Sequence, residues 1–303
     1  MSKQALIACK ISQTFEKALI ERGWKLIPYT NDYDADSVKG ILSSTKMKLD
    51  TETLQLFPNL QWVGRLGSGM EIIDMDYCRQ NDIVCVSSPL GISNAVAEHI
   101  CGMLISWHKN IQKSAFELRE KLWSREPNRG QELSSKTLGI IGCGHTGSAT
   151  AKLMRHLCKE VIVYDKYVHD ISIKNVRQTE LKELQENADI ISFHLPTNEE
   201  TKHYYDEEFI KHCKKHLLVN SSRGGIVSSQ ALLKALKNGT ALGACLDVLE
   251  GEEYLHEKNH EHWKIVRELS DFGVIITPHV AGYSHEAIEK MSTELFDQLN
   301  HLF

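Results

Sequence analysis

The sequence predicts a parallel α/β protein that contains two successive β-sheets. Short apolar runs alternate with segments of helical periodicity from one end of the 303-residue chain to the other. Such alternation is typical of parallel strands that are joined by crossover helices. The runs form two series, which are separated by a long apolar segment at Asn94–Lys113. A chain of this length is also long enough for about two domains.

Each predicted strand is a short apolar run. The first series is Ala5–Ala8, Lys25–Pro28, Lys39–Leu42, Gln61–Gly64 and Ile83–Val86. The second series is Leu138–Ile141, Val161–Tyr164, Ile190–Phe193, Leu217–Val219, Leu242–Leu246 and Val274–Thr277. The intervening segments have helical spacing: Phe15 and Leu19 lie on one face, and Gly23 ends that helix. Two successive parallel sheets are the simplest arrangement of these elements.

The segment Asn94–Lys113 predicts a helix of unusual character. Its residues are apolar nearly all round, so the helix must be buried on several sides. A helix that joins two domains, or that packs across a subunit interface, would be buried in this way. An ordinary core helix is the alternative.

The composition is that of a globular protein with a normal core. Hydrophobic residues make up 42% of the chain and charged residues 25%. The net charge is −5, and no block of Lys and Arg follows a phosphate backbone, so we do not expect nucleic acid as a partner. The run Ala5–Ala8 is too short for a signal peptide, and no segment reaches the roughly 18 apolar residues of a membrane span. We expect a cytoplasmic protein with no membrane partner.

The eight cysteines are scattered and form no Cys-x-x-Cys pair. Most lie in apolar contexts, as Cys85 and Cys245 do, where a thiol behaves as a small buried hydrophobe. The pattern predicts reduced, structural cysteines.

A glycine-rich loop follows the predicted strand Leu138–Ile141. Gly142, Gly144 and Gly147 form Gly-x-Gly-x-x-Gly, and a helical segment follows directly. In this setting the first glycine permits a tight turn, the second lets backbone approach a pyrophosphate, and the third lets helix and strand pack closely. The amides at the helix N-terminus then face the phosphates. The loop predicts a dinucleotide site.

Asp165 strengthens that prediction. It ends the next strand, Val161–Tyr164, roughly 20 residues beyond the loop, where a carboxylate bonds both ribose hydroxyls and repels a 2′-phosphate. Asp165 therefore favours NAD over NADP. Lys166 follows directly and reduces this repulsion.

Further motifs follow in a fixed order along the chain. They are His194–Thr201, Asn220–Gly225, Leu246–Glu252 and Thr277–Gly282, preceded by Val63–Gly69 and Ser93–Glu98. Together with the glycine loop, these segments resemble the D-isomer-specific 2-hydroxyacid dehydrogenase family. The resemblance covers most of the chain.

The resemblance implies two Rossmann-like, doubly wound parallel-sheet domains with the active site in the cleft between them. Residues 1–92 plus 281–303 would form the substrate domain, and residues 93–280 the NAD-binding domain. It also implies a homodimer formed largely through the nucleotide domain.

The resemblance identifies Arg223, Glu252 and His279 as the catalytic set, and their chemistry is suitable. Oxidation of a secondary alcohol requires the hydroxyl proton to leave as hydride moves, and a histidine carries protons near neutral pH. A carboxylate fixes the tautomer and stabilises the imidazolium, the role predicted for Glu252. The planar fork of Arg223 suits a substrate carboxylate and 2-oxygen better than lysine does.

The resemblance also implies a cofactor site and a substrate site. The cofactor residues would be Gly142, Gly144, His145, Thr146, Gly147, Asp165, Leu195, Pro196, Ser221, Ser222, Arg223, Asp247, His279 and Gly282, with Asp247 holding the nicotinamide amide. The substrate residues would be Arg65, Gly67, Ser68, Gly69 and Arg223, and the backbone amides of residues 67–69 can form an anion nest.

Arg65 is the residue most informative about the substrate. A similar Val-Gly-Arg segment in phosphoglycerate dehydrogenases helps bind the substrate's phosphate, so oxidation of 3-phosphoglycerate to 3-phosphohydroxypyruvate in serine biosynthesis is the favoured function. Alternatively, Arg65 has a structural role, as an arginine at a strand end that pairs with a neighbouring acid. Glyoxylate, hydroxypyruvate, erythronate 4-phosphate or a branched 2-oxo acid are alternative substrates. An NAD(H)-sensing, corepressor-like binding protein is an alternative of another class.

The sequence departs from the family's pattern near the predicted catalytic glutamate. Glu253 stands where the family usually has proline, so three glutamates are clustered, and the choice of Glu252 rests on its offset from Asp247. His256 and His260 have a helical metal-ligand spacing, but we favour a solvated loop or lid helix and expect no metal. Since the chain ends soon after its last helix, we expect no appended regulatory domain.

Overall fold

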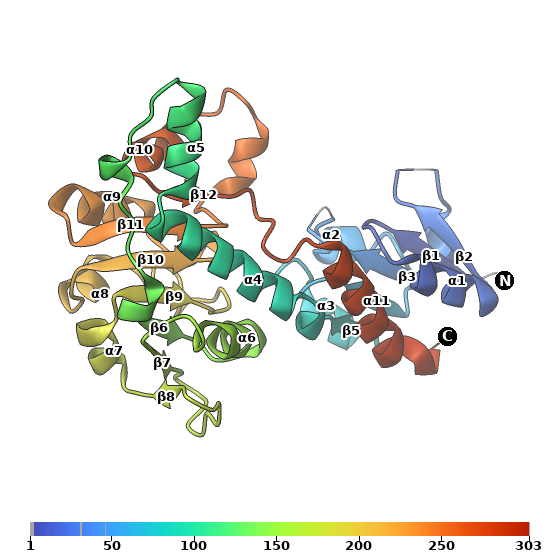
Figure 1. Ribbon diagram of the computed structural model, residues 1–303. Coiled ribbons are helices and arrows are strands. Elements are labelled where there is room, and N and C mark those ends of the chain that lie inside the picture. The colour runs from blue at the N-terminus through green and yellow to red at the C-terminus, as the bar shows by residue number, and fades with distance from the viewer. Residues whose placement is uncertain (1–2, 31, 46, 303) are drawn as a thin grey trace. The chain divides into compact units, whose positions relative to one another are not determined.

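The computed structural model describes residues 3–30, 32–45 and 47–302. The chain folds into two compact units, Met1–Ser93 with Gly282–Phe303 and Asn94–Ala281. Each unit contains a sheet whose neighbouring strands are all parallel (Figure 1). The prediction of an α/β fold with two parallel sheets is therefore confirmed.

The first unit has a five-stranded sheet in the order β2-β1-β3-β4-β5. Its strands are β1 (Lys3–Ile7), β2 (Trp24–Pro28), β3 (Val38–Ser43), β4 (Trp62–Arg65) and β5 (Val84–Ser87). Its helices are α1 (Gln13–Glu21), α2 (Thr51–Leu54), α3 (Met75–Gln80) and α11 (His285–Leu299), with 3-10 turns at Ala35–Ser37 and Asn300–Leu302. Polar caps begin these helices: the Asp74 carboxylate accepts from the N–H of Tyr77 at 2.9 Å.

The C-terminal helix α11 belongs to this first unit because it packs against the first sheet. A Cβ atom built on Gly64 of β4 would lie 3.4 Å from Leu299 and 3.5 Å from Leu295. One built on Gly91 would lie 2.5 Å from the backbone nitrogen of Met291. The glycines at positions 64 and 91 therefore allow α11 to pack closely against the first unit.

The second unit has a seven-stranded sheet in the order β12-β11-β10-β9-β6-β7-β8. Its strands are β6 (Thr137–Ile141), β7 (Glu160–Tyr164), β8 (Arg177–Gln178), β9 (Ile190–Phe193), β10 (His216–Asn220), β11 (Ala241–Leu246) and β12 (Ile275–Ile276). Its helices are α5 (Ile111–Arg119), α6 (His145–Met154), α7 (Leu181–Asn187), α8 (Glu207–Lys211), α9 (Ser229–Asn238), α10 (Trp263–Asp271) and most of α4 (Pro89–His108). The 3-10 turns are Glu126–Asn128, Leu133–Ser135, Gly224–Ile226 and Glu252–His256.

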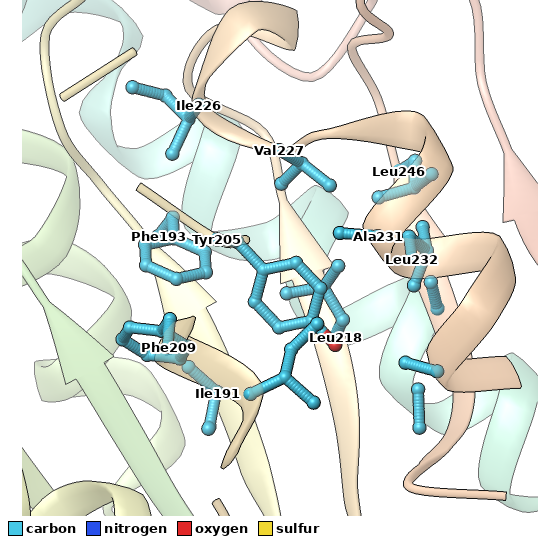
Figure 2. Packing of buried hydrophobic residues seen from close by; sticks show 14 of the residues in the cluster. Ile191, Phe193, Tyr205, Phe209, Leu218, Ile226, Val227, Ala231, Leu232 and Leu246 are labelled. Carbon is cyan, nitrogen blue, oxygen red and sulfur yellow. The ribbon is translucent and has the colours of Figure 1, made fainter. Parts of the chain in front are cut away.

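A cluster of aromatic and aliphatic side chains fills the core of this unit (Figure 2). Phe193 of β9 makes edge-on contacts with Tyr205, and both rings lie against Phe209 of α8. The Tyr205 hydroxyl is buried, and it shares a 3.0 Å hydrogen bond with Nε2 of His216. The core therefore fixes the carboxyl end of β9, which precedes Leu195 and Pro196.

Two expectations about the elements were wrong in part. The long apolar helix does not run to residue 113, because α4 ends at His108 and Asn110 adopts a left-handed φ of +52° before α5. Within the predicted segment, Val96, Ile100 and Leu104 are buried, while Ile105 is exposed. The strand β8 was missed because two residues carry too little pattern to predict a strand.

Two further findings concern the whole chain. All eight cysteines are free thiols. Within residues 3–30, 32–45 and 47–302, no helix is both long enough and apolar enough to cross a membrane.

Candidate active site

The predicted site residues of the second unit follow the carboxyl ends of six of its strands. The glycine loop follows β6, Asp165 follows β7, and Leu195 and Pro196 come soon after β9. Arg223 follows β10, Asp247 directly follows β11, and His279 comes soon after β12. Because all seven strands are parallel, these loops emerge at one edge of the sheet, where α/β proteins bind ligands.

The loop Gly142–Gly147 joins β6 to the N-terminus of α6. Gly142 has a φ of +92°, which favours glycine. A Cβ on Gly147 would lie 2.0 Å from the carbonyl oxygen of Gly142, so a side chain there would force α6 away from the strand. Gly144 is the N-cap of α6 and faces open space. The amides of His145 and Thr146 therefore begin α6 beside open space that suits a pyrophosphate.

Asp165 lies against this loop. Its Oδ2 accepts a 2.6 Å hydrogen bond from the backbone N–H of Cys143. Its Oδ1 accepts from the N–H groups of Tyr167 and Val168 at 2.9 and 3.1 Å. These bonds fix the carboxylate beside the glycine loop, which is the position that ribose recognition requires.

His194 is a structural residue that ties the β9 loop to α6. Its Nδ1 is 3.1 Å from Oγ1 of Thr146, and its Nε2 is 3.0 Å from Oγ of Ser192. Burial lowers the pKa of His194 to about 4, so its imidazole is neutral at pH 7. The bonds place Leu195 beside the glycine loop, since its Cδ2 would lie 3.0 Å from a Cβ on Gly142.

The loop after β10 is held by Asn220. The Asn220 Oδ1 accepts from the N–H and the hydroxyl of Ser222 at 3.1 and 2.8 Å, and its Nδ2 donates to the carbonyl of Arg223 at 2.9 Å. The Arg223 guanidinium donates to the carbonyl of Ser222 at 2.7 Å. The buried Oγ of Ser221 has no hydrogen-bond partner in the described part of the chain. A polar atom without a partner fits contact with a bound cofactor.

His279 and Glu252 form a direct pair. The Nδ1 of His279 is 2.6 Å from Oε1 of Glu252, and Oε2 of Glu252 accepts from the N–H of Leu249 at 3.0 Å. The hydrogen bond and charge of Glu252 raise the pKa of His279, with a smaller contribution from Asp247, while burial and Arg223 oppose the rise. With Nδ1 occupied, Nε2 is the nitrogen that is left to exchange a proton with a substrate. Glu253, the neighbouring acid, is exposed.

Asp247 is almost fully buried and organises the segment around His279. Its Oδ1 accepts from the Thr277 hydroxyl at 2.5 Å and from the N–H of Val280 at 2.9 Å, and its Oδ2 accepts from the N–H of Ala281 at 2.7 Å. Its carbonyl accepts from the N–H of His279 at 2.8 Å. Contact between Asp247 and a nicotinamide amide stays a prediction.

Two groups near the site were missed by the sequence reasoning. His99 of α4 places Nε2 2.9 Å from the Thr277 hydroxyl and 3.5 Å from Asp247 Oδ1. Glu250 accepts from the N–H of Ser229 at 3.1 Å and lies 2.5 Å from Nε2 of His203. These contacts join residues far apart in the chain, so no local pattern indicated them.

The histidines of the Glu-rich segment are separated by a change of structure. His256 ends a 3-10 turn, and His260 lies beyond it, so the two do not share a helix. The ring of His260 stacks on Tyr254 at 4.8 Å, and Nε2 of His262 is 2.5 Å from the Glu250 carbonyl. His256 and His260 therefore do not lie one helical turn apart, as their spacing in a helix would require.

The predicted substrate residues of the first unit lie together at the end of β4 and directly after it. Arg65 is buried, and its Nε and Nη1 donate to the carbonyls of Gly69 and Leu66 at 3.1 and 2.5 Å. Gly67 has a φ of +136°, and its N–H donates to Ser88 Oγ at 3.1 Å. The Arg65 guanidinium thus connects the two ends of the segment Leu66–Gly69 through hydrogen bonds. Gly282 lies at the start of the returning segment of this same unit.

This chain belongs to the D-isomer-specific 2-hydroxyacid dehydrogenase family. Residues 101–281 match the family model described as "D-isomer specific 2-hydroxyacid dehydrogenase, NAD binding domain". That match contains the whole seven-stranded sheet and the loops that follow its strands.

Comparisons with known proteins extend over the whole chain. A D-3-phosphoglycerate dehydrogenase from Bacillus subtilis is 31% identical over 98% of this chain, which spans 56% of that enzyme's length. An (S)-sulfolactate dehydrogenase from Chromohalobacter salexigens is 32% identical over 93% of this chain and 88% of its own length. The crystal structure of D-lactate dehydrogenase from Aquifex aeolicus, complexed with NAD and lactic acid, has a TM-score of 0.84 at 27% identity and covers 99% and 95% of the two chains.

Proposed function

We propose that this protein interconverts a small D-2-hydroxy acid and its 2-oxo acid. The observation that carries the proposal is the 2.6 Å contact between His279 and Glu252, on the sheet edge that also holds the glycine loop and Arg223. An orienting carboxylate behind an imidazole is a general acid/base arrangement. The similarity to dehydrogenases of phosphoglycerate, sulfolactate and lactate supports the same reaction.

Each of the proposed site residues has a separate role in the reaction. NAD, when bound, accepts hydride from carbon 2 of the alcohol. His279 accepts the hydroxyl proton at Nε2 during oxidation and returns it during reduction. Glu252 stabilises the imidazolium, and Arg223 binds the substrate carboxylate and polarises the 2-oxygen. Asp165 binds the adenosine ribose, and the start of α6 binds the pyrophosphate.

For the substrate, we propose 3-phosphoglycerate, which would place the enzyme at the entry to serine biosynthesis. The similarity to D-3-phosphoglycerate dehydrogenase and the Val63–Gly69 segment support it. Sulfolactate, the substrate named for a second relative, is also a three-carbon 2-hydroxy acid with an anionic group on carbon 3. In the first unit, Gly67–Gly69 would contact the carboxylate of a substrate of that class, and Arg65 would contact its second anion.

One observation favours a second candidate, an unphosphorylated 2-hydroxy acid. The Arg65 guanidinium donates to the carbonyls of Leu66 and Gly69, as expected of a residue that shapes the loop. In that case the Gly67–Gly69 amides would bind only the carboxylate of a substrate such as glycolate or glycerate.

A panel of substrates tests the proposal. Initial rates of NADH formation and consumption would be measured with 3-phosphoglycerate, sulfolactate, lactate and glycerate and with their 2-oxo acids. We expect kcat/KM to be highest for a substrate with an anion on carbon 3. Highest kcat/KM with lactate or glycerate would support the second candidate, and no turnover with any pair would contradict the proposed function.

A further inference from the structure

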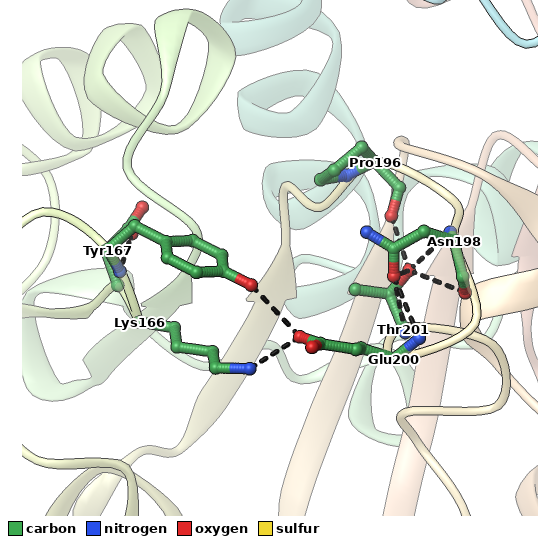
Figure 3. Close-up of polar contacts among 7 residues, drawn as sticks. Lys166, Tyr167, Pro196, Asn198, Glu200 and Thr201 are labelled. Atoms are coloured by element: carbon green, nitrogen blue, oxygen red, sulfur yellow. Dashed lines mark hydrogen bonds and ion pairs between the residues drawn. The ribbon is translucent and has the colours of Figure 1, made fainter.

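A three-residue contact lies at the ribose end of the proposed cofactor site. Lys166 directly follows Asp165, and Glu200 lies in the loop after β9. The Oε2 of Glu200 accepts hydrogen bonds from Nζ of Lys166 at 2.5 Å and from the hydroxyl of Tyr167 at 3.0 Å (Figure 3). Lys166 Nζ also lies 5.3 Å from the centroid of the Tyr167 ring. The ammonium group is thus held between a carboxylate and an aromatic ring.

The position of Glu200 is fixed by its own loop. The Oδ1 of Asn198 accepts from the N–H groups of Glu200 and Thr201 at 2.9 and 3.0 Å. The Thr201 hydroxyl donates to the carbonyl of Pro196 at 2.6 Å (Figure 3). Glu200 therefore meets Lys166 from an ordered turn of the loop that contains Pro196, a predicted cofactor residue.

The charges of this contact bear on the choice between NAD and NADP. A 2′-phosphate carries nearly two negative charges at neutral pH, and sites that accept it provide a cation beside the ribose. Lys166 is the cation that adjoins Asp165. Its pKa is raised by Glu200, and the pKa of Glu200 is lowered by Lys166, so both groups are charged at pH 7.

We propose that Glu200 is a specificity-determining residue of the cofactor site. It holds the Lys166 ammonium away from a 2′-phosphate, and the loss of this cation from the ribose end of the site disfavours NADP. The proposal rests on the proposed function, in which Asp165 binds the ribose. In this proposal, both Asp165 and the loop after β9 contribute to the preference for NAD over NADP.

The expected size of the effect follows from the exposure of the pair. The side chains of Lys166 and Glu200 are 57% and 60% exposed. Exposed ion pairs change an equilibrium constant by a factor of roughly two to five. We therefore expect Glu200→Gln to lower the ratio of the NADPH and NADH dissociation constants about threefold to fivefold, and Glu200→Lys to lower it further.

Calorimetric titration of the purified protein with NADH and with NADPH tests the proposal without relying on turnover. Lys166→Met keeps the length of the side chain and removes its charge. In the double variant with Glu200→Gln, it should abolish the gain in NADPH binding, because that gain comes from the released ammonium. Glu199→Gln is the matched control, since it removes the same charge from the adjacent position of the same turn.

Each outcome decides the proposal. The proposal is supported if the ratio of the NADPH and NADH dissociation constants falls in Glu200→Gln and stays unchanged in Glu199→Gln. The tighter NADPH binding of Glu200→Gln must also disappear when Lys166→Met is added. An equal change in Glu199→Gln, or a gain that persists without Lys166, would show only a general effect of charge and would overturn it. If NADH binds and Glu200→Gln leaves the ratio unchanged, this inference fails alone. If neither dinucleotide binds the unmodified protein, the proposed function fails with it.

Discussion

At the scale of single residues, His279 combines an unusual backbone with a strong partner. Its φ is +55°, a value that non-glycine residues rarely adopt. The N–H of His279 donates to the Asp247 carbonyl, and the Asp247 carboxylate binds the two amides that follow. Asp247 therefore stabilises the strained conformation that directs the imidazole towards Glu252.

Removal of the imidazole should abolish most of the activity but leave the cofactor in place. We expect His279→Ala to lower kcat by a factor of roughly 10² to 10⁴, the usual contribution of a positioned acid/base. NADH binding, measured by fluorescence titration, should survive. An unchanged kcat would contradict the assignment of His279 as the proton carrier.

The pH dependence should report the Glu252 contact. Glu252 raises the pKa of His279, so oxidation, which needs the neutral imidazole, should increase as the pH rises through that raised value. Reduction needs the imidazolium and should decrease over the same range. In Glu252→Gln the pKa falls back, and both profiles of kcat/KM should move to lower pH. The exposed Glu253→Gln should leave them in place, and the reverse result would assign the role to Glu253.

At the scale of elements, Glu250 connects three segments that surround the catalytic residues. Its carboxylate binds His203 and the start of α9, and its carbonyl binds His262. A Cβ on Gly224 would lie 2.0 Å from the Leu249 carbonyl, so the turn that carries Glu252 touches the residue after Arg223. The geometry of both catalytic loops thus depends on this turn.

Loss of the Glu250 carboxylate should disturb the turn and so the catalytic pair. Hydrogen bonds to charged groups contribute about 1.5–3 kcal/mol, so we expect Glu250→Ala to lower kcat roughly tenfold or more and to lower the melting temperature. The pH profile should also move partway towards that of Glu252→Gln. The control is Glu253→Ala, because Glu253 lies on the same turn with its side chain exposed. Equal effects of both variants would contradict a positioning role.

Arg65, the last residue of β4, distinguishes between the two candidate substrate classes. If Arg65 binds an anion on carbon 3, Arg65→Ala should raise KM for 3-phosphoglycerate about tenfold to a hundredfold and change KM for glycerate little, because one charge-assisted bond is lost. KM values for the two substrates would be compared in the same preparation. An equal rise for both would mean that Arg65 acts through the Leu66 and Gly69 carbonyls.

The sequence predicted these elements best where a local pattern determines them. The glycine loop was predictable because Gly142 needs a positive φ and Gly147 allows close packing. The family resemblance implied the pairing of a glutamate with His279, and the offset from Asp247 selected Glu252 among the clustered glutamates. The contact of Glu250 with His203 could not, because tertiary folding alone brings those residues together. The break at Asn110 was also hidden, since apolar residues continue on both sides of it.

At the scale of the whole molecule, the second unit has an exposed apolar surface that its own fold does not explain. Exposed apolar side chains are frequent in α5 and in the residues after it, namely Ile111, Phe116, Leu118, Leu122 and Trp123. Trp123 is 87% exposed, which is unusual for the largest apolar side chain. Aromatic side chains gathered on a surface are typical of protein interfaces. We therefore propose that a second copy of this chain covers this surface in a homodimer.

The dimer can be tested by replacing apolar residues on and off this surface. We expect the unmodified protein to sediment as a dimer at micromolar concentration. Phe116→Asp combined with Trp123→Asp should convert it to a monomer, because two charges would have to be buried without partners. Leu56→Asp is the matched control: Leu56 is as exposed as Phe116, at 62%, but lies in the first unit, so its replacement should leave the dimer intact. A monomeric unmodified protein, or a dimer that survives the double replacement, would contradict an interface at α5.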